Sequence, residues 1–112
     1  MKKQTKKSPR DHHCVYVVKL EGVPRGRGRE VYVGMTGLTP EARFDKHRTG
    51  YKSSRWVHKY GTRLLPELYS GLSGLSYREA LLTEKSLART LRDQGYKVYG
   101  GIRLSTPQYI QK

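Results

Sequence analysis

An acidic side chain stands in the apolar stripe of a helix expected over residues 77–94. At about 100° per residue, Glu84 falls in the middle of this stripe, whose apolar members are Ala80, Leu87, Ala88 and Leu91. A carboxylate that faces the core is costly when it has no partner. Two interpretations stand: Glu84 lies at the rim of the domain and pairs with an arginine of a neighbouring element, or it binds a divalent cation at the floor of a cleft.

A basic pair lies on an earlier helix, which is expected to begin at Thr39 and to end at Gly50. Arg43 and His47 are four residues apart and therefore project from one face of this helix. A guanidinium can hold two phosphate oxygens, and an imidazole can hydrogen-bond the same group or a water molecule. Taken alone, the pair also fits a solvated basic helix.

Two tyrosines, Tyr16 and Tyr32, lie in the middle of strands expected over residues 14–20 and 30–35. By default a strand tyrosine packs its ring and leaves its hydroxyl at the edge of the core. On one face beside the basic pair and Glu84, the two phenols would form a site for phosphodiester hydrolysis. One phenol would polarise or deprotonate water, the arginine would offset phosphoryl charge, and a metal ion would steady the leaving oxygen.

The elements that position these side chains follow from capping and turn signals. A Gly- and Pro-rich turn joins the first two strands into an antiparallel hairpin, and the 77–94 helix begins with capping-box spacing at Ser76 and Glu79. Strands and helices alternate too irregularly for a doubly wound sheet, so we expect a small α+β sandwich. The other expected elements are a short helix from Ser53 or Ser54 to Lys59, an edge strand over 63–69 that Pro66 weakens, and a strand over 96–101.

The composition describes one small domain with a large positive charge. The chain has 112 residues, with 23 Lys and Arg against 9 Asp and Glu, for a net charge of +14. A polyanion relieves this self-repulsion, and nucleic acid is the usual one. We expect a disordered basic arm over residues 1–12 and a single folded domain over 13–112. The sequence has no apolar stretch typical of a membrane span or secretory signal, and its one cysteine, Cys14, fits a reducing interior; we therefore expect an intracellular protein, cytoplasmic or associated with the nucleoid.

Basic residues gather at two further places, and we expect both to contact phosphates. Residues 24–28 resemble the core of an AT-hook without its second proline, and a flexible hairpin tip is the alternative. A basic cluster follows around Trp56 and Val57, whose own side chains we expect in core packing. The residues expected to bind nucleic acid are Arg25, Arg27, Arg29, Lys52, Arg55, His58 and Lys59.

The order of these parts resembles the GIY-YIG nuclease superfamily over nearly the whole folded chain, from about Cys14 to about Gly101. The resemblance lies in VYV at 15–17, YVG at 32–34, Arg43 with His47 four residues later, and Glu84 in a long helix. It implies a small antiparallel three-stranded sheet flanked by helices, which agrees with the α+β expectation.

The resemblance also implies a role for each matching position. Tyr16 would be the general base, and Tyr32 would help to order the attacking water. Arg43 would neutralise the scissile phosphate with assistance from His47. Glu84 would hold one Mg²⁺ or Mn²⁺.

Gly34 matches the closing glycine of the second triplet, where the backbone lies close to its neighbours. The chain also departs from the family pattern: the first triplet lacks its glycine, and Val replaces Ile in the second. The family often has an Asn after the metal-binding helix, whereas this chain has no Asn and carries Val98-Tyr99-Gly100 in that region.

We therefore expect a metal-dependent endonuclease domain that acts on DNA with low intrinsic sequence specificity. The alternative from another class is a non-catalytic nucleic-acid-binding module, on DNA or RNA, with the same scaffold. The sequence leaves open a homodimer or a targeting partner protein. Two other nuclease chemistries fit badly, because an HNH-type site needs an Asn and a PD-(D/E)xK site needs an acid two residues before a Lys, and the sequence has neither.

Overall fold

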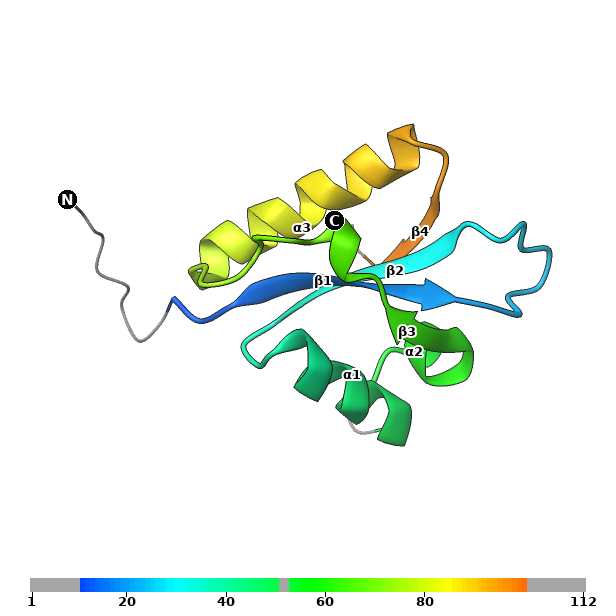
Figure 1. Ribbon diagram of the computed structural model, residues 1–112, viewed down its shortest axis with the longest axis horizontal. Helices are drawn as coiled ribbons and strands as arrows, with labels where there is room; N and C mark the ends of the chain where they lie inside the picture. Colours follow the sequence, from blue (N-terminus) through cyan, green and yellow to red (C-terminus); the bar gives the residue numbers. More distant parts are fainter. Residues whose placement is uncertain (1–10, 51–52, 101–112) are drawn as a thin grey trace, which may run out of the picture.

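The computed structural model describes residues 11–50 and 53–100, and Figure 1 shows the arrangement of its strands and helices. The sheet has the strand order β3-β1-β2-β4, and β1 is antiparallel to both of its neighbours, whereas β2 and β4 are parallel. The strands are β1 (Cys14–Leu20), β2 (Glu30–Thr36), β3 (Gly61–Leu64) and β4 (Lys97–Gly100).

The α+β class is confirmed, but the three-stranded antiparallel sheet is wrong. The sheet is four-stranded and mixed, because the strand predicted over 96–101 adds to the free edge of β2 as β4. Helix α3 (Tyr77–Asp93) runs back along the sheet before this strand, so the chain enters β4 in the direction of β2. Such a return through a helix is the usual connection into a parallel pair.

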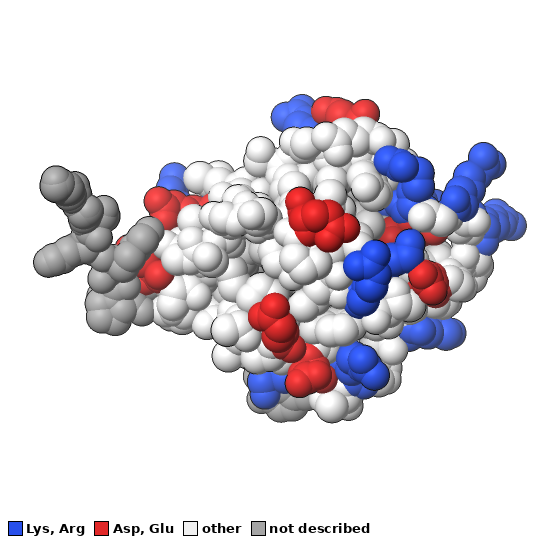
Figure 2. All heavy atoms as spheres, viewed as in Figure 1, with Lys and Arg blue, Asp and Glu red and all other residues white. Residues whose placement is uncertain are grey.

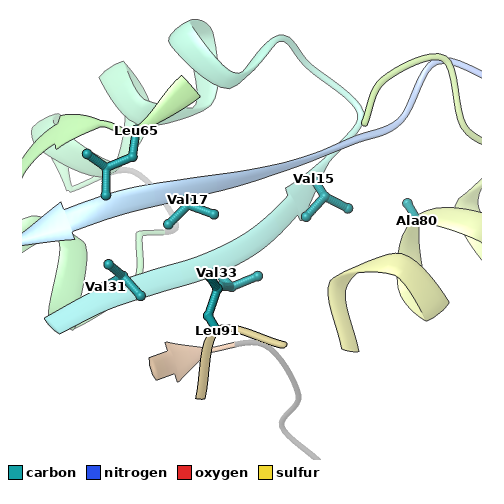
Figure 3. Packing of buried hydrophobic residues seen from close by; sticks show 7 residues of the cluster. All are labelled: Val15, Val17, Val31, Val33, Leu65, Ala80 and Leu91. Atoms are coloured by element: carbon teal, nitrogen blue, oxygen red, sulfur yellow. The ribbon is translucent and has the colours of Figure 1, made fainter. Parts of the chain in front are cut away.

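Helices cover both faces of the sheet (Figure 1). Helix α3 packs on one face, and α1 (Pro40–Thr49) and α2 (Arg55–Tyr60) pack on the other. Strand β1 divides its side chains between these layers, because successive residues of a strand point to opposite faces. The cluster on the α3 side, shown in Figure 3, consists of Val15, Val17, Val31, Val33, Leu65, Ala80 and Leu91.

Capping side chains fix the ends of the helices as predicted. The Thr39 hydroxyl accepts a hydrogen bond from the amide of Ala42 at the start of α1, and Gly50 ends this helix with φ +87°. Ser54 caps α2, and Ser76 and Glu79 form both hydrogen bonds of a capping box at α3. These local signals therefore place the helices correctly.

The edge strand is shorter than predicted. β3 stops at Leu64, and a 3₁₀ turn, η2 (Pro66–Leu68), follows directly. Pro66 has no amide hydrogen for the sheet, so the strand predicted over 63–69 is correct only for its first two residues.

Three segments, 1–10, 51–52 and 101–112, lie outside the described residues. Of the basic arm predicted over 1–12, only Asp11 and His12 belong to the described part. Lys52 of the predicted basic cluster lies outside it, as does the end of the domain predicted to reach residue 112.

Candidate active site

The candidate active site centres on a hydrogen bond between β1 and α1. The phenolic oxygen of Tyr16 lies 2.8 Å from Nε2 of His47, and each of these residues is only 1% exposed. The ring of Tyr32 completes the cluster, with its centroid 6.3 Å from that of Tyr16 and 5.7 Å from that of His47. The two phenols and the imidazole predicted from the sequence therefore lie in one cluster.

A backbone contact that the sequence analysis missed determines which nitrogen of His47 carries hydrogen. The amide of Ser54 donates to Nδ1 of His47 at 3.0 Å, so Nδ1 must be unprotonated. In the neutral ring the hydrogen is then on Nε2, which donates to the phenolic oxygen of Tyr16. Burial lowers the pKa of His47 to about 4, and the nearby charge of Arg43 acts in the same direction. His47 is thus a fixed neutral donor.

Arg43 and Glu84 both act on the Tyr16 hydroxyl. Burial raises the pKa of this phenol above its ordinary value of 10, and Tyr32 and the charge of Glu84 raise it further. The charge of Arg43 and a side-chain hydrogen bond from its guanidinium lower the pKa. The Arg43 guanidinium therefore contacts the phenol directly, whereas Glu84 acts on it through its charge, as the smallest of these effects. The net effect keeps that phenol protonated at neutral pH.

Gly34 provides the space in which the Tyr16 ring lies. Tyr16 and Gly34 are partners across the β1–β2 pair. A Cβ on Gly34 would lie 2.6 Å from the Tyr16 oxygen and 2.9 Å from Cε2 of Tyr32. Any larger residue would displace both rings. The position that matches the closing glycine of the motif thus shows the close approach that the resemblance implied.

A second glycine, Gly100, provides the space for Tyr32 from the edge strand. Gly100 has φ +72°, and a Cβ there would lie 2.5 Å from the carbonyl oxygen of Val33 and 2.6 Å from Cε1 of Tyr32. In the sequence this region stands out for its missing Asn. The Gly-Gly pair at 100–101 was the available signal, because glycine often marks close backbone approach in a strand.

The three arginines of the β1–β2 loop are not equivalent. Arg29 binds the carbonyl oxygens of Gln94 and Gly95 at the end of α3, and its guanidinium lies 4.3 Å from the ring centroid of Tyr96. This side chain therefore joins the loop to α3. Arg25 and Arg27, like Arg29, are exposed, and Figure 2 shows Lys and Arg gathered mainly toward the end of the molecule at which this loop lies.

Buried Glu30 organises the loop that presents these arginines. Its carboxylate accepts hydrogen bonds from the amides of Arg27 at 2.6 Å and Gly28 at 3.0 Å. These amide bonds, that of Arg27 first, hold the pKa of the carboxyl below its usual value. The exposed arginines thus rest on a fixed turn.

The basic residues of α2 lie beside the site. Arg55, His58 and Lys59 are exposed. Nδ1 of His58 also lies 3.0 Å from the carbonyl oxygen of His47, which makes it the donor to that oxygen. Val57 is buried and Trp56 packs against its cluster, so the core packing predicted for both is confirmed.

A divalent cation at this site would have few protein ligands. Among residues 11–50 and 53–100, no group of three or more His, Cys, Asp or Glu side chains could hold a metal ion. A cation on Glu84 would therefore take most of its ligands from water and from bound phosphate. Mg²⁺ suits such a site, because it commonly keeps several waters and uses one or two carboxylates.

No model of a known protein family matches this sequence, and comparison with curated proteins and with solved structures gave no match. The resemblance to GIY-YIG nucleases therefore rests on the motif residues and their spacing. Within the described part of the chain, no helix has the length and apolar character needed to cross a membrane.

Proposed function

We propose that this chain is a metal-dependent endonuclease domain that hydrolyses phosphodiester bonds of DNA. The observation that supports this proposal is the set of groups around the Tyr16 hydroxyl. His47 bonds to it, Arg43 bonds to it and lowers its pKa, and the charge of Glu84 raises that pKa. A proton acceptor, a phosphate-binding cation and a carboxylate for a metal ion are the parts that phosphodiester hydrolysis needs.

In this proposal Tyr16 is the general base. The oxygen of water forms a bond to phosphorus, one ester P–O bond breaks, and the proton that the water loses goes to the Tyr16 phenolate. Nε2–H of His47 donates to the phenolic oxygen and stabilises the phenolate before the transfer. Tyr32, whose ring adjoins both, helps to order the water.

Arg43, and Glu84 through a bound cation, would stabilise negative charge on the reacting phosphate. The guanidinium has five N–H donors, so Arg43 can bond to Tyr16 and to a phosphoryl oxygen together. Glu84 would hold the cation with water and phosphate. When bound, Mg²⁺ or Mn²⁺ supplies Lewis-acid stabilisation of the charge that develops on the phosphoryl and leaving oxygens.

The second candidate function is a non-catalytic nucleic-acid-binding module, and the raised pKa of Tyr16 favours it. At neutral pH only a small fraction of this phenol is ionised, so little phenolate is present to accept a proton from water. Both candidates bind DNA through Lys and Arg and lose affinity as salt rises. The two candidates differ only in whether the bound DNA is cleaved.

Nicking of supercoiled plasmid with Mg²⁺ or Mn²⁺ separates the two functions. Each site variant has a control on its own helix: Glu84→Gln with Asp93→Asn on α3, and Arg43→Ala with Arg48→Ala on α1. We expect at least a roughly hundredfold loss of nicking in the site variants, wild-type rates in the controls, and DNA binding in all. Equal traces of nicking in every protein would contradict the nuclease and leave the binding module.

A further inference from the structure

A cavity of about 390 Å³ opens beside the candidate active site, on the side of the sheet edge. It is lined by Tyr32, Ser54, Trp56 and Gly100. Its volume lies in the range of small-molecule pockets. Tyr32 and Trp56 contribute aromatic rings to this lining, and Tyr32 also touches the Tyr16–His47 pair through ring contacts. The cavity and the candidate site therefore share a wall.

The Trp56 ring packs against the rings of two tyrosines. Its centroid lies 4.3 Å from that of Tyr99 on β4 and 6.0 Å from that of Tyr60 on α2. Tyr99 is the register partner of Tyr32 across the parallel pair, so both rings rise from the same side of the sheet. A rigid aromatic wall of this kind loses little conformational entropy when a flat ligand packs on it.

The surroundings of the cavity are basic. Nζ of Lys97 lies 5.9 Å from the ring centroid of Tyr99, and Arg55 is exposed next to Trp56 in the sequence. The whole chain carries a net charge of +14. An aromatic pocket within a positive surface combines the two features by which proteins hold single-stranded nucleic acid, namely base stacking and backbone charge.

We propose that this cavity receives one unpaired nucleobase of a DNA strand, which packs against Trp56 and Tyr32. The proposal rests on the proposed function for the choice of DNA as ligand. Because Tyr32 borders both sites, the base in the cavity would belong to a nucleotide next to the phosphate that Arg43 holds. The preferred substrate would then have single-stranded or flipped nucleotides at the cleavage point, since a paired and stacked base cannot enter.

Intrinsic fluorescence tests this proposal directly, because Trp56 is the single tryptophan of the chain. The full chain is titrated in EDTA, which prevents metal-dependent cleavage, with an oligodeoxythymidylate of about 12 nucleotides. The matched ligand is an abasic oligonucleotide with the same number of phosphates. We expect the thymidylate to quench the emission and the abasic strand to bind without quenching. Equal quenching by both ligands, or binding of thymidylate without quenching, would overturn the proposal.

Two variants extend the test to affinity, measured by anisotropy of labelled oligonucleotides. Trp56→Leu removes the wall, whereas Tyr60→Leu removes a neighbouring ring that does not line the cavity. Loss of one base stack corresponds to roughly 5- to 100-fold weaker thymidylate binding for Trp56→Leu, with abasic binding and the Tyr60→Leu variant unchanged. Trp56→Phe keeps a ring, and we expect it to retain most of the affinity. If Trp56→Leu does not fold, the comparison of quenching by thymidylate and by the abasic strand decides the proposal.

The outcomes keep this proposal separate from the nuclease itself. Base-dependent quenching in a protein that never nicks plasmid would support the cavity and contradict the nuclease. Metal-dependent nicking without base-dependent quenching would support the nuclease and contradict the proposed base cavity. Stronger quenching by oligouridylate than by oligothymidylate would overturn the assignment of the ligand as DNA.

Discussion

The two faces of the sheet bury different kinds of side chain. On the α3 face, β1 and β2 contribute valines that pack with Ala80 and Leu91 into an apolar cluster. On the α1–α2 face, the same two strands contribute Tyr16 and Tyr32, and α1 contributes His47, whose side chain is as deeply buried as the valines. A buried phenol and imidazole must satisfy their polar atoms, and here they do so with each other and with Ser54.

This contrast shows how one strand serves stability and chemistry at once. Val15 and Val17 hold β1 against α3, while Tyr16 between them points to the opposite layer. Changes to the apolar cluster on the α3 face should therefore affect mainly the free energy of unfolding, whereas changes to the Tyr16–His47 cluster on the α1–α2 face should affect turnover as well as stability.

The largest effect on stability is expected on the α3 face. Leu91→Ala removes a side chain that is 2% exposed, and we expect it to lower the free energy of unfolding by about 2–5 kcal/mol. Leu82→Ala on the same helix is the control, because Leu82 is 57% exposed and should change stability by less than about 0.5 kcal/mol. Urea unfolding measures both; equal losses would contradict the assignment of the two sides of α3.

The next effect is the pH dependence of stability that His47 causes. The unfolded chain binds a proton at this residue near pH 6.5, but the folded chain binds it only near pH 4. Acidification from 6.5 to 4 therefore destabilises the fold, by up to about 3 kcal/mol from His47. His47→Asn keeps an acceptor for the Ser54 amide and removes this contribution. Urea unfolding at several pH values should show a shallower loss in the variant, and parallel curves would contradict the neutral buried imidazole.

The smallest effect separates two arginines of one loop. Arg27→Ala should leave stability unchanged and reduce the salt slope of DNA binding by about 1. Arg29→Ala should instead lower the free energy of unfolding by about 1 kcal/mol, because it removes bonds to the carbonyls of Gln94 and Gly95. Fluorescence anisotropy at several salt concentrations and urea unfolding measure the two effects. The reverse pattern would contradict the structural role of Arg29.

Local signals in the sequence predicted the elements well. Strands 14–20 and 30–35 and the caps at Thr39, Ser54 and Ser76 depend on residues within a few positions of each other. The parallel addition of β4 was not predictable in the same way. It depends on the length and path of α3 across the sheet, which no short window encodes.

The candidate site could be predicted in its members but not in its bonds. Glu84 is a candidate because its carboxylate stands in an apolar stripe, and Arg43 and His47 are candidates because they lie four residues apart on one helix. The contact between Tyr16 and His47 joins residues 31 positions apart. The Ser54 amide and Gly100 act through backbone geometry, which residue type does not reveal.

Tyr16 is the proposed general base of the nuclease, and the pH dependence of single-turnover nicking shows whether its hydroxyl has this role. The pKa of this phenol is raised above its ordinary value of 10, so the phenolate fraction grows with pH throughout the range from 7 to 9. We predict a wild-type rate that rises about tenfold per pH unit without a plateau in that range, and a Tyr16→Phe rate at least about a hundredfold lower. A folded Tyr16→Phe variant that nicks DNA at the wild-type rate, with the same pH profile, would contradict this role.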